Sequence, residues 1–305
     1  MKQTKLFDQF YNQHVKLDRK RTIRLKQHIT SVESFLKKTK WSHRIVSIQM
    51  QGSWRHGTMI QPLPKKEYDA DMLVLLQPNS RWKASDYLDQ IYSAFKKSPT
   101  YSSKVSRKTR CVTLDYAGDF HLDVVPCIIR QESELIFFRK ETYFVCNRNL
   151  GRYERTDGDG FAMWLEKKKA VVPGANLRKV IQLLKYMRDH KQTFAVKSIL
   201  MTTLIGNCIR NNERERDFTD IPTSLQTILT RVDNYLSHNE TTPLIKNPAY
   251  EKENFNRNWE EVNYQNFKRQ IRSLKLRVDD AISEPGRNSS LQKWQALFGQ
   301  NFGSK

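Results

Sequence analysis

The alternation of apolar and polar residues changes its period along the chain, and each change marks an expected element. From about Leu17 to Lys40, apolar residues recur mostly every three or four positions, which predicts an amphipathic helix. Residues 46–50 then alternate between apolar and polar side chains, which predicts a half-buried strand that ends at the Gly52-Ser53 pair. The pattern predicts a second strand at Tyr68–Leu76 and a helix at Asp86–Lys97.

The middle of the chain is typical of a sheet and the remainder is typical of helices. Segments 110–116 and 120–128 flank a short turn and indicate a hairpin, and we expect edge strands at 135–139 and 143–146. After about residue 160 the apolar spacing is helical, with helices expected at 177–188, 197–211, 225–236 and 267–282. We therefore expect an α+β protein: a mixed sheet lobe at residues 1–160, which includes the N-terminal helix, and a helical lobe at 161–305, with a cleft between them.

Charge is the main compositional signal. The 305 residues hold 53 Lys and Arg against 32 Asp and Glu, a formal net charge of +21, which predicts a polyanionic partner such as nucleic acid, nucleotides or an anionic membrane surface. Aromatic residues make up 11%, enough for a packed core. The chain has neither an apolar run near 18 residues nor a signal-peptide pattern, so we expect no membrane helix.

The four cysteines are spaced like ordinary buried thiols. They form no CxxC pair and no Cys/His cluster with zinc-finger spacing, so a structural zinc site is not expected. Their apolar neighbours favour burial in a reducing compartment, which indicates a cytoplasmic protein. The four are Cys111, Cys127, Cys146 and Cys208.

Three aspartates on predicted strands indicate a metal site. Asp69 and Asp71 are two positions apart, so a strand places both carboxylates on one face. Asp123 lies in the apolar-flanked segment HLDVVP, and we prefer it as the third carboxylate to Asp115 and Asp119. Carboxylates that converge need a cation, and hard oxygen ligands suit Mg²⁺ or Mn²⁺. Three of them can hold two metals for a phosphoryl transfer.

The segment that begins at Gln51 supplies a complementary feature. Gly52 after a strand allows the backbone to approach a phosphate, and the Ser53 hydroxyl can donate another hydrogen bond. A lone DxD is usually solvated acid and a lone Gly-Ser is usually a turn. Together with a third strand aspartate, however, the set is specific for phosphate and metal chemistry. His56, which follows, is expected on the surface of a helix.

These motifs resemble a known superfamily. GSWRHGT, EYDADMLVLL and HLDVVP resemble the GS, DxD and distal Asp pattern of polymerase-β-like nucleotidyltransferases. The segments LRKVIQLLKYMRDHKQTFAVKSILMTTLI, NPAYEKENFNRNW and KWQALFGQNF are similar to elements of one bacterial subfamily. The chain thus resembles the cGAS/DncV-like nucleotidyltransferases (CD-NTases of SMODS type) found in CBASS antiphage systems.

The resemblance implies a reaction and roles for particular residues. Such an enzyme condenses nucleoside triphosphates, with ATP among them, into a cyclic di- or trinucleotide and releases pyrophosphate. Asp69, Asp71 and Asp123 would be the catalytic and metal-binding residues for two Mg²⁺ ions, with Mn²⁺ as an alternative, and Asp123 would help to deprotonate the acceptor hydroxyl. The resemblance implies nucleotide contacts from Gln51, Gly52, Ser53, Lys185, Lys197 and Ser198. It also implies a monomer without membrane contact, whose product acts on a separate effector protein.

Two alternatives stay open at this stage. One is a polymerase-β-like transferase that extends RNA or tRNA ends, which the +21 charge would suit. The other is a basic nucleic-acid-binding protein with a vestigial site. The intact aspartates argue against the second, and the helical motifs argue against the first.

Overall fold

The chain folds into two compact units in a computed structural model that describes residues 1–135 and 138–304, without the side chains of 132–140. The sheet unit consists of Asp18–Arg55 and Pro64–Asp159. The helical unit consists of Met1–Leu17, His56–Leu63 and the chain from Gly160 onward. Each unit is therefore assembled from separate stretches of sequence.

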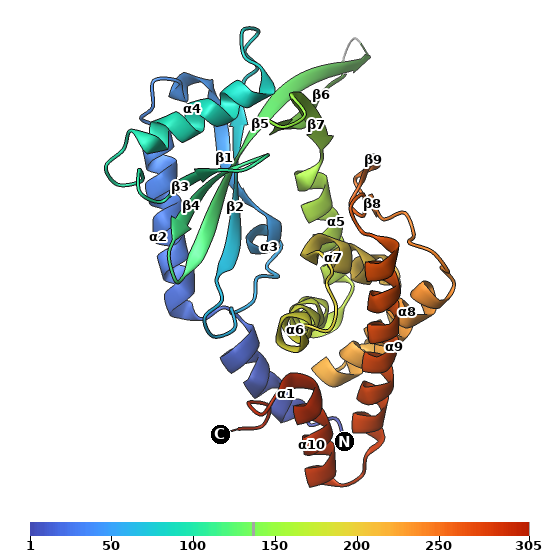
Figure 1. Cartoon of the computed structure of the whole chain (residues 1–305). Coiled ribbons are helices and arrows are strands. Elements are labelled where there is room, and N and C mark those ends of the chain that lie inside the picture. The colour runs from blue at the N-terminus through green and yellow to red at the C-terminus, as the bar shows by residue number, and fades with distance from the viewer. Residues whose placement is uncertain (136–137, 305) are drawn as a thin grey trace. The chain divides into compact units, whose positions relative to one another are not determined.

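The sheet unit is built on a mixed sheet (Figure 1). Its strands run in the order β1-β2-β5-β4-β3, and β6 pairs with both β5 and β7. The β2–β5 pair is parallel and the other pairs are antiparallel. The strands are β1 Ile45–Gln51, β2 Tyr68–Leu76, β3 Val105–Arg107, β4 Val112–Tyr116, β5 Phe120–Leu135, β6 Phe138–Asn147 and β7 Arg152–Thr156. The predicted mixed sheet is confirmed.

Two helices of the sheet unit, α2 Arg19–Leu36 and α4 Ala84–Lys96, pack on one face of the sheet. His28 of α2 lies against Tyr116 of β4, with ring centroids 4.1 Å apart, and Phe35 stacks on Phe95 of α4. The predicted helix at 17–40 is thus confirmed in shorter form, although one of its regularly spaced apolar residues, Ile23, is 45% exposed. Because α2 and α4 cover this face, side chains on the opposite face are left for other contacts.

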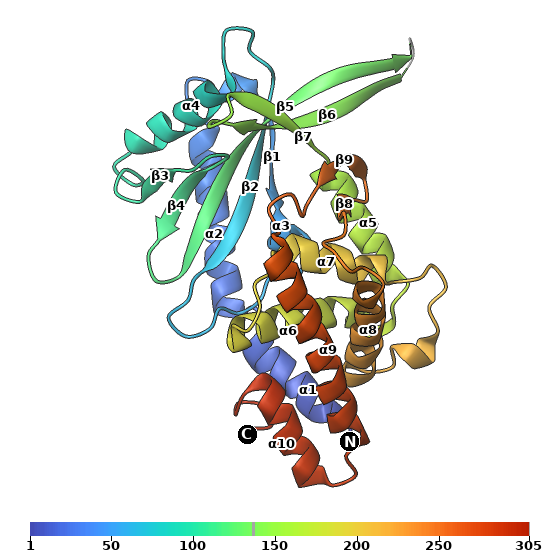
Figure 2. The same cartoon turned by 45° about the vertical axis from the view of Figure 1, so that its right-hand side comes forward.

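Strands β5 and β6 form a long hairpin that extends beyond the rest of the sheet, as Figure 2 shows. The sequence predicted a strand that ends near Ile128 and two short edge strands. That prediction was wrong in length, because β5 continues to Leu135 and β6 begins at Phe138. Part of the expected strand at 135–139 lies outside the described residues.

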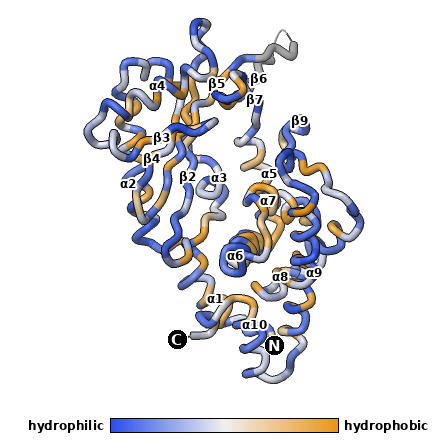
Figure 3. Tube along the Cα trace, viewed as in Figure 1, coloured by the Kyte–Doolittle hydropathy of each residue, from blue (hydrophilic) through white to orange (hydrophobic). Residues whose placement is uncertain are grey.

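The helical unit packs its helices around one apolar core. Its helices are α1 Thr4–Phe10, α5 Gly158–Ala170 (whose first two residues belong to the sheet unit), α6 Asn176–Lys191, α7 Ser198–Asn207, α8 Ile221–Ser237, α9 Glu261–Ser283 and α10 Arg287–Phe298. Helix α7 is mostly apolar, as its orange trace in Figure 3 shows, and Leu200, Met201 and Leu204 are buried. The four predicted helices are confirmed as α6 to α9.

Several elements were not predicted. Helices α1 and α10 are short, and aromatic contacts hold them together: Phe7 lies 4.8 Å from Trp294 and 4.9 Å from Phe302 between ring centroids. The strands β8 Lys246–Asn247 and β9 Tyr250–Asn254 form a small separate sheet. Such short segments carry too few apolar repeats to stand out in sequence.

Two predictions from composition can be compared with the fold. Three cysteines are buried, Cys208 is half-buried, and all four are free. Among the helices described here, none has both the length and the apolar character needed to cross a membrane. The predicted α+β class is confirmed.

Candidate active site

One register row crosses four strands on the face of the sheet opposite α2 and α4. Gln51 of β1 pairs with Asp71 of β2, Asp71 pairs with Asp123 of β5, and Asp123 pairs with Thr113 of β4. Residues paired in this way lie side by side on neighbouring strands, about 4.8 Å apart at the backbone. The row therefore brings together two of the three aspartates that the sequence singled out. We call it the Asp71 row.

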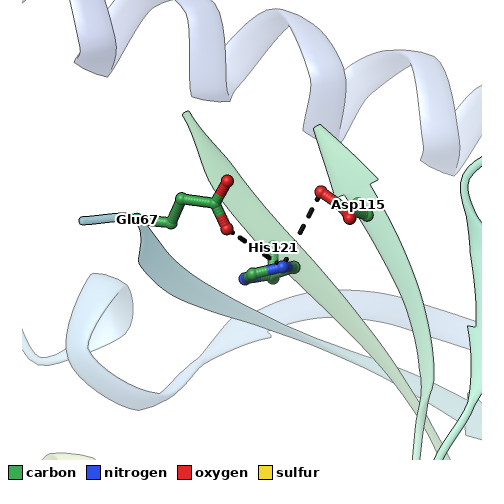
Figure 4. Close-up of side chains that lie close together, drawn as sticks. All are labelled: Glu67, Asp115 and His121. Atoms are coloured by element: carbon green, nitrogen blue, oxygen red, sulfur yellow. Dashed lines mark ion pairs between the residues drawn. The ribbon is translucent and has the colours of Figure 1, made fainter. Parts of the chain in front are cut away.

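A second polar row lies two residues along each strand. Asp69 pairs with His121, and His121 pairs with Asp115. Figure 4 shows the imidazole of His121 between two carboxylates, 3.1 Å from Glu67 and 3.7 Å from Asp115. Together with His121, these two residues offer ligand atoms within 4.8 Å of one another. Asp69 is turned to the other ring nitrogen, with its Oδ1 atom 3.6 Å from Nδ1. The Asp69 carboxylate is thus close to His121 and largely exposed.

Asp71 is the most strongly perturbed acid of the rows. Burial raises its pKa to about 6, and the negative charges of Asp123 and Asp69 contribute in the same direction. The positive charge of Lys108 opposes this shift but does not cancel it. A carboxylate that is disfavoured as an anion by burial and by two other carboxylates is stabilised by a bound cation. Carboxylate oxygens are the donors that a divalent metal ion prefers, so the chemistry of these aspartates suits such an ion.

The backbone of Gly52 lies directly beside the carboxylate of Asp71. It opens the short helix α3 (Gly52–Arg55) with a left-handed φ of 62°, and a Cβ atom there would overlap the Asp71 carboxylate. Only glycine combines this backbone conformation with this close approach. Ser53 follows in α3 and is half-buried. Gly52 thus lies directly against the aspartate.

Two residues that the sequence analysis missed contact Asp123. The hydroxyl of Thr113 donates a hydrogen bond of 2.5 Å to Oδ1, and the ammonium of Lys108 lies 3.3 and 3.4 Å from the two carboxylate oxygens. Burial lowers the pKa of Lys108, but the charge and hydrogen bond of Asp123 outweigh it and raise the pKa overall. Asp123 is thereby held by a neutral donor and a cation.

A third missed residue, Asp159, lies at the start of α5 and holds the side chains around the Gly-Ser pair. Arg55 forms an ion pair with it at 3.0 Å, and the amide groups of Gln49 and Gln51 donate to it at 3.4 Å. This contact gives the Arg55 side chain a structural partner. Gln51 faces this cluster from β1.

The residues expected from the helical region lie in the helical unit. Lys185 is 3% exposed, and its ammonium donates to the carbonyl and hydroxyl oxygens of Thr58. Burial lowers its pKa to about 7. Lys197 is exposed at the N-cap of α7, and the Ser198 hydroxyl accepts a hydrogen bond from Arg188. Their roles in phosphate binding stay predictions.

Three other residues were weighed from sequence. His56 is not on a helix surface: it is 7% exposed and its ring lies 5.0 Å from that of Phe161, so that expectation was wrong. Asp119 pairs with Arg24 at 2.8 Å, and Asp115 lies beside His121. Among these rivals, only Asp123 pairs directly with Asp71.

Comparison with protein families gives a match over more than half of the chain. Residues 1–169 match the model of the Second Messenger Oligonucleotide or Dinucleotide Synthetase domain. A curated protein from Roseivirga ehrenbergii, named c-di-GMP synthase, is 29% identical over 121 residues. That alignment covers 39% of this chain and 31% of the relative, so the chain matches less than a third of that protein.

Solved structures share the fold along nearly the whole chain. CdnC of E. coli MS115-1, solved with ATP, is 18% identical with a TM-score of 0.76, and the match covers 99% of both chains. CdnG of Bradyrhizobium diazoefficiens, in complex with GTP, is 18% identical with a TM-score of 0.73, over 97% of this chain and 94% of that one. DncV of Vibrio cholerae in its apo form has a TM-score of 0.66 at 12% identity, over 99% and 87%.

Proposed function

Because the chain belongs to the second messenger oligonucleotide or dinucleotide synthetase family, we propose that it joins nucleoside triphosphates into a cyclic di- or trinucleotide and releases pyrophosphate. The observation that carries this proposal is the Asp71 row, in which Asp71 pairs with Asp123 while Gly52 lies against the Asp71 carboxylate. The relatives solved with ATP and with GTP support triphosphates as the substrate class.

We propose that Asp69, Asp71 and Asp123 hold two Mg²⁺ ions, with Mn²⁺ as the alternative. Bound to these carboxylates, the metal would neutralise the triphosphate and make the acceptor hydroxyl more acidic. The raised pKa of Asp71 supports this assignment, since a cation is what would stabilise its ionised form. The exposed Asp69 carboxylate would complete the set from the neighbouring row.

The transfer step follows from this arrangement. A ribose hydroxyl oxygen of one nucleotide forms a bond to the α-phosphorus of another, the bond to the β-phosphate breaks, and pyrophosphate leaves with the electron pair. Asp123 would take up the hydroxyl proton, directly or through water. A second transfer of the same kind closes the smallest ring. Catalysis in this scheme comes mainly from positioning and charge.

We propose that the donor triphosphate lies along Gln51, Gly52 and Ser53. Gly52 allows the backbone to approach a phosphate, and the Ser53 hydroxyl can donate to one. Lys185, Lys197 and Ser198 are proposed as further phosphate contacts on the strength of the family resemblance. An ammonium has three N–H donors, and Thr58 takes two of those of Lys185. Among the contacts of the described residues, one donor of Lys185 therefore remains for a ligand.

Incubation of the purified chain with all four nucleoside triphosphates and Mg²⁺ or Mn²⁺ tests the proposal. After phosphatase treatment, mass spectrometry should find a resistant product that carries no terminal phosphate. The Asp71→Asn variant should lose this product. A matched control is Asp119→Asn, because Asp119 pairs with Arg24 and lies outside the Asp71 row.

Other products would point elsewhere. Elongation of added RNA, without a phosphatase-resistant small product, would show a tailing transferase and contradict ring formation. A resistant product made equally well by Asp71→Asn would contradict the site.

We further propose that the product acts on a separate effector protein in antiphage defence, and that the synthase works as a monomer on ATP among its substrates.

A further inference from the structure

Thr113 is buried beside a proposed metal ligand. It lies in β4 directly opposite Asp123 of β5, in the antiparallel register of the hairpin. Its side chain is almost entirely enclosed, with 2% exposure. Residues paired in this way have Cβ atoms about 5 Å apart on the same face of the sheet, so a threonine hydroxyl reaches an aspartate carboxylate. The hydrogen bond of 2.5 Å between Thr113 and Asp123 follows from this register.

The direction of the hydrogen bonding is fixed by chemistry. An ionised carboxylate only accepts, so the Thr113 hydroxyl must use its one hydrogen toward Oδ1 of Asp123. The sulfur of Cys111 lies 3.9 Å from the same hydroxyl. A cysteine thiol is a weak donor that can bond to the threonine oxygen. Thr113 is thus constrained on both sides.

Lys108 cannot supply the same constraint. Its ammonium lies at similar distances from both oxygens of Asp123, and its side chain is 52% exposed. A flexible lysine contributes a point charge, whereas a short, buried hydroxyl on a β-branched residue has few rotamers. Rotation of the Asp123 carboxylate is therefore limited by Thr113. The hydrogen bond occupies one lone-pair direction of Oδ1 and leaves Oδ2 without a bond to this hydroxyl.

We propose that Thr113 is a positioning residue that holds the Asp123 carboxylate in the orientation that binds the divalent metal ion. This inference rests on the proposed function, because it takes Asp123 as a metal ligand. Partners that hydrogen-bond to metal-binding carboxylates orient them, and their loss typically costs 10- to 100-fold in metal affinity or activity. The role of Thr113 is carried by its hydroxyl and not by its volume.

Titration of the full chain with Mn²⁺ alone, with free Mn²⁺ measured by electron paramagnetic resonance, tests the proposal without turnover. Thr113→Val keeps the shape and removes the hydroxyl, so it should weaken Mn²⁺ binding by about 10-fold. Thr113→Ser keeps the hydroxyl and should bind within about threefold of the wild type. In an Asp123→Asn background, Thr113→Val should have little further effect, because the two changes remove the same interaction.

Three results would overturn the role of Thr113: wild-type binding by Thr113→Val, an equal loss in Thr113→Ser, or additive losses in the Asp123→Asn background. Should Thr113→Val fail to fold, Thr113→Ala compared with Thr113→Ser gives the same test. Asp71→Asn separates this inference from the proposed function. If Asp71→Asn weakens Mn²⁺ binding and Thr113→Val does not, only the role of Thr113 fails. If neither does, the metal site itself is wrong.

Discussion

The backbone of Gly52 lies so close to the carboxylate of Asp71 that no side chain fits between them. Gly52→Ala would both strain a backbone with a φ of 62° and push a methyl group into the carboxylate. We expect this variant to lose about 100-fold in turnover, since displacement of a reacting group by about 1 Å costs that much. Steady-state rates of cyclic product formation measure it.

A matched control exists for the strain alone. Gly151 has nearly the same φ, 61°, and nothing lies near the position where its Cβ would be. Gly151→Ala should therefore have the same backbone strain as Gly52→Ala but turn over at the wild-type rate. If both variants lose turnover equally, the close approach to Asp71 is not the cause.

The raised pKa of Asp71 predicts a pH-dependent cost. The pKa of the Asp71 carboxyl is about 6 in the folded state, whereas the ordinary pKa of an aspartate is 3.8. Without divalent metal, Asp71 should therefore lower the free energy of unfolding as the pH rises from about 4 to 6, by up to about 3 kcal/mol. Chemical denaturation across this range should show Asp71→Asn equal to the wild type at pH 4 and more stable at pH 7. Parallel curves for the two proteins would contradict the shift.

The lowered pKa of Lys185 predicts that the free energy of unfolding changes with pH in the opposite direction in the alkaline range. Burial lowers its pKa from 10.5 to about 7, with a further contribution from the charge of Arg188. Between these values the unfolded chain binds the proton and the folded chain releases it, so the free energy of unfolding should rise with pH from about 7 to 10. Lys185→Met should flatten this rise. Lys197→Met, at an exposed lysine of a neighbouring helix, should leave it unchanged; the reverse pattern would refute the burial argument.

A buried ion pair should contribute measurably to the stability of the helical unit. Arg231 of α8 binds the carboxylate of Glu213 through two hydrogen bonds of 2.6 and 2.9 Å, and the Glu213 side chain is only 1% exposed. Arg231→Met should cost about 3–5 kcal/mol, because it removes the countercharge of a buried carboxylate and leaves it with the backbone N–H of Arg210 as a donor. The double variant Arg231→Met/Glu213→Leu should recover much of that loss in urea denaturation. An equal loss in the single and double variants would assign the effect to packing.

The sequence predicts the structure correctly where the spacing of residues along a strand is enough to determine which side chains share a face. The period of two in a strand places Asp69 and Asp71 on one face, and β2 has the predicted bounds Tyr68–Leu76. Thr113 was within reach of the same reasoning. Counting back from the Tyr116–Phe120 pair beside the predicted turn puts Thr113 opposite Asp123.

Other features depend on contacts that spacing does not reveal. The ion pair of Arg55 with Asp159 joins residues more than a hundred positions apart, and the burial of His56 depends on Phe161. Lys185 lies within a helical pattern, but its burial follows from Thr58, in a segment that the sequence assigned to the sheet lobe. The burial and contacts of these residues depend on segments that are distant in the sequence. Local patterns of apolar and polar residues therefore do not reveal them.

The path of the chain between the two units has a consequence for chimaeras. The segment His56–Leu63 belongs to the helical unit, where Thr58 binds Lys185 and Met59 accepts a hydrogen bond from Gln182. A graft of the sheet unit from one relative onto the helical unit of another therefore needs four junctions, after Leu17, Arg55, Leu63 and Asp159. Recombination at one point would separate Thr58 and Met59 from Lys185 and Gln182, so a chimaera needs the segment His56–Leu63 from the same parent as its helical unit.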